Sequence, residues 1–223
     1  MRFEAAIIAH QPRTTGRNHG LMTRISAFAC WVVLAALLLT PSTACAQDLQ
    51  LKGLLQGAQD QIGKTVRYDP SYQPIAFPGG DVPIDRGVCS DVIVRAYRKI
   101  GIDLQLLVNQ DMRQNFGAYP HRLWMLSRAD PNIDHRRVAN LVVFFTRHGQ
   151  ALPTSSEARD YKPGDIVAWR IPDGRPHIGL VSDWQQNGRP LVIHNIGAGA
   201  QLEDVLFTFT ITGHYRYLPE KGS

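Results

Sequence analysis

Short apolar-rich runs separated by turn signals fill the end of the chain and constrain its fold more than any other feature. The runs DIVAWRI (165–171), HIGLVSDW (177–184) and LVIHNIG (191–197) have the length and composition of strands. PDGRP separates the first two runs, and QQNGRP, with the hairpin pair Asn187-Gly188, separates the last two. VLFTFTIT and HYRYL continue the pattern. This order predicts an antiparallel sheet of five to six strands.

Helices are predicted ahead of these strands. DLQLKGLLQGAQDQIG (48–63) has apolar residues at helical spacing. VCSDVIVRAYRKIGI (88–102) has one apolar face, basic residues in its last turn and a terminating Gly101. Residues 102–160 predict loops with short helical pieces, then a helix from about 134 to 147. Helices followed by a strand meander, without alternating crossovers, predict an α+β fold with the second helix packed on the sheet.

The N-terminal segment has the parts of a secretory signal peptide. A basic Arg24 precedes the apolar run AFACWVVLAALLL, and the small-residue site ACA (44–46) follows it. We expect cleavage after Ala46, with Met22 as an alternative start, and a periplasmic or secreted protein. The apolar run is shorter than the roughly 20 residues of a membrane span, so no stable span is expected after cleavage. Residues 47–223 have the length of one domain.

Charge and ligand spacing argue against two classes of function. The formal net charge is +5, but arginines of the leader supply most of the excess, so nucleic-acid binding is not expected. No close ligand pair such as His-Glu-x-x-His is present, so we expect neither a metal nor a cofactor, and we expect a monomer. The polar cluster DHRR (134–137) is either a solvated helical turn or a substrate-binding patch.

A single cysteine remains after removal of the leader. The chain has 3 Cys, and both Cys30 and Cys45 precede the cleavage site. Cys89 is therefore either a small buried hydrophobe or a reactive thiol. It falls in the first turn of the second predicted helix, where the positive end of the helix dipole favours a thiolate. The position predicts a lowered pKa for Cys89.

Two histidines lie where a base for this thiol is needed. A thiolate nucleophile requires a base and a group that orients the base. His177 opens a strand, and His194 lies in the next strand of the predicted hairpin, where cross-strand pairing brings the two together. Gly179, on the same face as His177, predicts a close approach of the helix that carries Cys89. These residues predict a line of Cys89, His177 and His194.

At these residues the chain resembles the NlpC-type papain-like cell-wall endopeptidases, most closely an exported, poorly characterised branch of that superfamily. VCSDVIVRAYRKIGIDL, YKPGDIVAW, HIGLVSD and VIHN match its blocks in order. The resemblance covers about residues 65–217, with weak support between 103 and 160. It implies that Cys89 is the nucleophile, that His177 is the general base and later acid, and that His194 orients the base.

The resemblance implies an exported cysteine amidase or endopeptidase. It would hydrolyse amide bonds of peptidoglycan stem peptides through an acyl-enzyme on Cys89, with backbone N–H groups meeting the oxyanion. Substrate-binding residues are not identified. The alternatives are a same-fold acyltransferase or amidase acting on another amide-containing exported substrate, and a non-catalytic cell-wall-binding module. A binding module would not need Cys89, His177 and His194 together, which favours catalysis.

The chain departs from the pattern of this superfamily at four places. Val88 precedes Cys89 where an Asp is usual. Asp91 stands where a small Gly is usual, which predicts an altered floor of the cleft. Ala76 holds the place of a tyrosine, and Tyr68 or Tyr72 is the alternative. The residues from about 103 to 160 are expected to be an insertion within the single domain.

Overall fold

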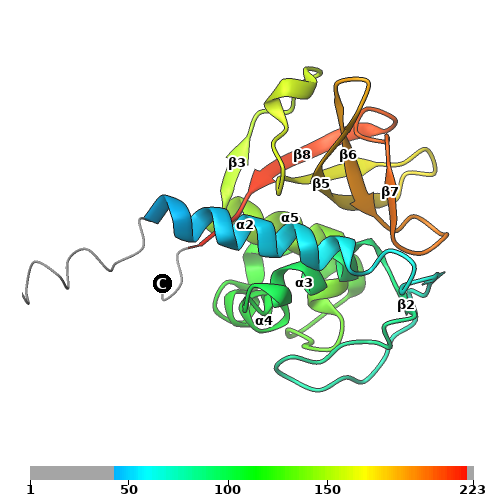
Figure 1. The fold of residues 1–223 in the computed structure, drawn as a ribbon. Helices are drawn as coiled ribbons and strands as arrows, with labels where there is room; N and C mark the ends of the chain where they lie inside the picture. The colour runs from blue at the N-terminus through cyan, green and yellow to red at the C-terminus, as the bar shows by residue number, and fades with distance from the viewer. Residues whose placement is uncertain (1–42, 220–223) are drawn as a thin grey trace, which may run out of the picture. The chain divides into compact units, whose positions relative to one another are not determined.

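The computed structural model of the protein describes residues 43–219, in which helices precede a six-stranded antiparallel sheet (Figure 1). The predicted α+β class is confirmed. Its α-helices are α2 (Thr43–Gln59), α3 (Cys89–Lys99), α4 (Leu104–Gln114) and α5 (Val138–His148), and its 3-10 turns are η1 (Phe116–Ala118), η2 (His121–Trp124), η3 (Asp134–Arg136) and η4 (Ala158–Asp160). No helix in this range is both long and apolar enough to cross a membrane. Most of the predicted signal peptide lies outside the described residues, and its predicted cleavage site at Ala46 falls in the first turn of α2.

The sheet has the strand order β3-β8-β4-β5-β6-β7, and every neighbouring pair is antiparallel. Its strands are β3 (Gln150–Leu152), β4 (Ile166–Arg170), β5 (Pro176–Gln186), β6 (Arg189–His194), β7 (Gln201–Glu203) and β8 (Thr210–Arg216). The predicted hairpin is β5-β6, where Asn187 and Gly188 have φ of 52° and 76°. The sequence did not predict β3 or β7, because three residues carry too little alternation to be recognised.

A second, parallel pair of strands precedes the second helix. It consists of β1 (Arg67–Tyr68) and β2 (Arg86–Gly87), with Tyr68 opposite Gly87. Because β2 ends two residues before Cys89, this pair brings the loop that begins at Tyr68 beside the start of α3.

Helix α3 contacts both α2 and β5 (Figure 1). Its predicted apolar face is buried, and its buried apolar side chains include Val92, Ile93, Ala96 and Tyr97. Helix α2 approaches closely at Gly57, where an added Cβ would lie 2.6 Å from Cβ of Lys99 and 2.9 Å from the carbonyl oxygen of Ala96. This packing on two sides fixes the helix that begins at Cys89.

The segment from 102 to 160 is more regular than predicted. Helix α4 begins after Asp103, whose carboxylate accepts from the N–H of Gln105, as an N-cap does. The second helix of the segment begins at Val138 and not at about 134, because residues 134–136 form the turn η3 instead. All three side chains of that turn are buried.

The Pro-Gly-Asp block before β4 fixes the sheet from within. Asp165 is fully buried, and its carboxylate oxygens lie 2.8 Å from Nε2 of His214 and 2.7 Å from Nε of Arg216, both on β8. Strand β4 is thereby held between β8 and β5, with Trp169 opposite His177. The fully buried Asp165 thus anchors β4, the strand that pairs with His177, to β8.

Candidate active site

Cys89 is the first residue of α3, as predicted. The N-cap is Val88, and the carboxylate of Asp91 accepts from the N–H of Val88 at 2.7 Å, which closes the first turn. The Cys89 side chain is only 4% exposed, because α3 packs against β5. The backbone N–H of Ile178 lies close enough to the sulfur to favour its thiolate form, so the thiol lies near the residue that follows His177.

Burial decides the protonation of this thiol. Loss of hydration raises the pKa of Cys89 to about 12, although the N–H of Ile178 and the N–H groups of the helix start act in the opposite direction. The lowered pKa predicted from the helix position is therefore wrong for this structure, because desolvation outweighs the dipole of the first turn. The free protein holds a neutral thiol at neutral pH.

The structure brings His177 and His194 into direct contact. Nε2 of His177 lies 2.9 Å from Nδ1 of His194, and both rings are buried. The backbone register explains this contact: Leu180 pairs with Ile193, so Gly179 lies about opposite His194. An added Cβ at Gly179 would lie 3.2 Å from Cβ of His194. The glycine therefore makes room for the neighbouring strand and not, as predicted, for the helix.

A carboxylate completes the chain of hydrogen bonds. Oε2 of Glu203 lies 2.8 Å from Nε2 of His194, and the Glu203 side chain is 45% exposed. Glu203 is on β7, where Val192 of β6 pairs with it, so it stands diagonally across from His194. Glu203 was not among the residues predicted from the sequence. The only sequence signal that leads to it is the three-residue strand that follows the Gly-Ala-Gly turn.

These contacts determine which nitrogens carry protons. Because the Glu203 carboxylate only accepts, Nε2 of His194 carries hydrogen, and Nδ1 of a neutral His194 is then an acceptor. Nε2 of His177 must donate to it, which leaves the lone pair of His177 on Nδ1. Burial, with the charge of the neighbouring His194, lowers the pKa of His177 to about 3. Burial also lowers the pKa of His194, against the opposing effect of Glu203. Both rings are therefore neutral at pH 7.

The sequence of the chain matches a known protein family. Residues 55–217 match the family described as domain of unknown function DUF1287. The chain belongs to this family. A relative from Escherichia coli (strain K12), described as uncharacterized protein YijF, is 57% identical over 165 residues, which cover 74% of this chain and 80% of the relative. The matched DUF1287 segment contains Cys89, His177, His194 and Glu203.

Within this DUF1287 domain, Asp91 does not form the floor of a cleft. It is buried, and its carboxylate lies 2.9 Å from Nε and 3.0 Å from Nη2 of Arg136. Arg136 also donates to the carbonyl oxygens of Asp69 and Ser71, and its own carbonyl accepts from Ser90. Neither interpretation of the polar cluster is correct for Arg136, because it clamps the loop after Tyr68 to the start of α3.

The two alternative tyrosines have different surroundings. Tyr68 is half-buried, and burial followed by the nearby Cys89 raises its pKa, so its hydroxyl stays protonated. Tyr72 instead hydrogen-bonds to Asp130 and Asn132, away from the thiol. Tyr68 is therefore the tyrosine that the DUF1287 domain places near Cys89. No group of three His, Cys, Asp or Glu side chains within residues 43–219 is arranged to hold a metal ion.

Proposed function

We propose that this DUF1287 protein is an exported cysteine hydrolase with an NlpC-type papain-like fold, which cleaves amide bonds of peptidoglycan stem peptides. The observation that carries the proposal is the hydrogen bond of 2.9 Å between His177 and His194, beside the first-turn Cys89. A structural pair of buried histidines would not need a thiol at this place. The N-terminal leader sequence supports export. The ordered motifs of the domain, from VCSDVIVRAYRKIGIDL to VIHN, support the substrate class.

The geometry suggests general-base catalysis from a neutral thiol and imidazole. Sγ of Cys89 attacks the carbonyl carbon while its proton moves to Nδ1 of His177, the only ring nitrogen of His177 left without a donor role. The new imidazolium donates to His194, whose other nitrogen donates to Glu203, so the positive charge is stabilised through two hydrogen bonds.

The rest of the cycle uses the same groups. The backbone N–H of Cys89 and the hydroxyl of Tyr68 are the donors that we assign to the oxyanion. When the C–N bond breaks, His177 gives its proton to the leaving amine, and an acyl thioester remains on Cys89. Water then attacks the thioester with His177 as base, which releases the acid and restores the thiol.

Incubation of the purified protein with purified peptidoglycan tests the proposal, with mass spectrometry to identify the released fragments. We expect wild-type protein to release peptide fragments and the Cys89→Ala variant to release none. Equal fragment release from both proteins would assign the cleavage to a contaminant. No release from either would refute the hydrolase, provided that a known cell-wall hydrolase digests the same material.

A non-catalytic cell-wall-binding module is the second candidate, because the Cys89 side chain is only 4% exposed. This alternative predicts that wild type and Cys89→Ala sediment with insoluble peptidoglycan to the same extent and that neither releases fragments. The two experiments share one substrate preparation. Their results therefore separate cleavage from binding.

A further inference from the structure

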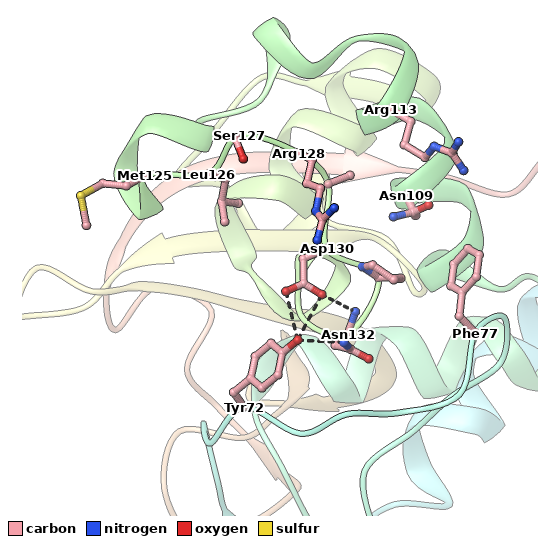
Figure 2. Close-up of a pocket in the computed structure, with 12 residues that line it drawn as sticks. Tyr72, Phe77, Asn109, Arg113, Met125, Leu126, Ser127, Arg128, Asp130 and Asn132 are labelled. Atoms are coloured by element: carbon pink, nitrogen blue, oxygen red, sulfur yellow. Dashed lines mark hydrogen bonds between the residues drawn. The ribbon is translucent and has the colours of Figure 1, made fainter.

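A pocket of about 730 Å³ lies outside the Cys89 site (Figure 2). One wall comes from the loop after Tyr68, and the others come from α4 and the segment that follows η2. The lining residues that matter for binding are Tyr72, Phe77, Arg113, Met125, Arg128 and Asp130. Most of them belong to the expected insertion. None of them belongs to the proposed catalytic line.

Two arginines give the pocket an unbalanced positive charge. Most arginines in residues 43–219 pair with a carboxylate, but within that range Arg113 and Arg128 form no ion pair. The acid in the lining is Asp130, whose carboxylate already accepts from the hydroxyl of Tyr72 at 3.1 Å and from the N–H of Asn132 at 2.9 Å. Both guanidinium groups are therefore available to an anion from outside, and their planar forks suit a carboxylate.

The remaining walls suit a peptide better than a small inorganic anion. The pocket is lined by Tyr72, Phe77 and Met125, which are 55%, 43% and 94% exposed. Figure 2 shows Phe77 and Met125 at opposite sides, with Arg128 between them. Aromatic and thioether surface beside guanidinium groups fits an amphipathic ligand that carries both a carboxylate and apolar side chains.

The pocket is within reach of the thiol along one loop. Tyr68 stands near Cys89, and Tyr72, four residues later, lines the pocket. Four residues span at most about 14 Å when extended, so the two sites are separated by a short peptide at most. Arg136 fixes the loop between them at the carbonyl oxygens of Asp69 and Ser71.

We propose that this pocket binds a carboxylate-bearing segment of a peptide substrate, with Arg113 and Arg128 as its anion ligands, a few residues from the bond attacked by Cys89. The link to cleavage rests on the proposed function, but binding to the pocket does not. The insertion would then determine which peptides are held, while α3 and the sheet carry the reaction.

Peptide binding to the uncleaving Cys89→Ala variant tests this directly. The probes are N-acetyl-Ala-Glu-Leu-amide and its uncharged partner N-acetyl-Ala-Gln-Leu-amide, with dissociation constants and affected residues taken from NMR titration. We expect the Glu peptide to bind at least tenfold more tightly and to shift residues around the pocket. Arg113→Gln and Arg128→Gln, each added to Cys89→Ala, should weaken its binding about tenfold. Arg122→Gln is the matched control, since this exposed arginine of the same segment does not line the pocket.

Several results would overturn the proposal. Equal affinity for both peptides would show that the carboxylate is not recognised, and an equal loss with Arg122→Gln would show only general electrostatic attraction. Inorganic phosphate that displaces the Glu peptide and shifts the same residues at lower concentration would indicate a phosphate site instead. If the pocket binds the Glu peptide while wild type cleaves no peptidoglycan, only the proposed function fails. If wild type cleaves peptidoglycan and both arginine variants bind the Glu peptide as tightly as Cys89→Ala alone, only the pocket proposal fails.

Discussion

Replacement of Arg136 by Met should destabilise the protein far more than loss of any surface ion pair. The side chains of Arg136 and Asp91 are 2% and 3% exposed, and two hydrogen bonds of 2.9 and 3.0 Å join them. Methionine keeps an unbranched apolar chain but has no charge, so the substitution leaves the Asp91 carboxylate buried with only the N–H of Val88 as a donor. The variant also loses both hydrogen bonds to the loop at Asp69 and Ser71.

The expected loss follows from the uncompensated charge. Removal of one partner of a buried ion pair costs roughly 3–5 kcal/mol, a large part of the 5–15 kcal/mol that stabilises an ordinary domain. With a urea dependence of about 2 kcal/mol per M for a domain of this size, the unfolding midpoint should fall by about 1.5–2.5 M. Asp91→Asn combined with Arg136→Met should recover part of the loss, because no buried charge then remains.

Urea unfolding followed by circular dichroism measures this effect. The matched control is Arg159→Met, because Arg159 pairs with Glu157 at 3.9 Å and is 81% exposed, so its midpoint should not move measurably. A midpoint for Arg136→Met within about 0.5 M of wild type would refute the reasoning, since the buried pair would then contribute no more than a surface pair. The reasoning would also be refuted if the double variant Asp91→Asn with Arg136→Met were less stable than Arg136→Met alone.

The remaining predictions concern the thiol, its base and acid stability. Alkylation of Cys89, followed by mass spectrometry of its peptide, should keep accelerating above the ordinary thiol pKa of roughly 8.5; an inflection near 7 would contradict the buried neutral thiol. His177→Ala should abolish turnover, whereas His194→Asn should leave measurable activity because its amide oxygen can still accept from His177; the reverse order would mean that the base is misassigned. Glu203→Gln should lower turnover about tenfold, or about 1.4 kcal/mol of barrier, because only the charge of the acceptor is lost; an unchanged rate would exclude Glu203 from the relay. His135 and His177 have folded pKa values of about 3, below the unfolded value of roughly 6.5, so the unfolded chain takes up protons first and stability should fall as pH falls from about 6.5 towards 3. A His135→Leu variant should lose less stability than wild type over that range, and parallel curves would contradict the assignment.

The parts of the site that could be predicted are those set by local pattern. Strand alternation and an Asn-Gly turn predict the β5-β6 hairpin, and a register shift between Val181 and Gln185 then sets the pairing that brings His194 to His177. Helical periodicity with a terminal glycine fixes α3 and therefore the first-turn position of Cys89. Both signals act over a few residues, so no knowledge of the rest of the chain is required.

The parts that could not be predicted depend on partners distant in sequence or on very short elements. Arg136 and Asp91 are 45 positions apart, and no residue near DHRR in the sequence indicates that the arginine pairs with a buried carboxylate. Glu203 reaches His194 only because a three-residue strand pairs with β6. From sequence alone, a charged side chain is predicted to be solvent-exposed. Its burial can be predicted only when the oppositely charged partner is known.

The thiol shows the same limit in its chemistry. The helix position of Cys89 is a local property and favours the thiolate, but the depth of burial depends on the packing of α3 against the sheet, and burial dominates. Because burial raises the pKa of Cys89 this far, almost none of the thiol is ionised at pH 7, so oxidants and electrophiles meet almost no thiolate. The proposed reaction then requires proton transfer to Nδ1 of His177 to accompany attack on the substrate, and the chain of His177, His194 and Glu203 is arranged to stabilise that imidazolium. The feature that contradicts the predicted low pKa is thus compatible with catalysis, provided that the base and its two supporting groups act together.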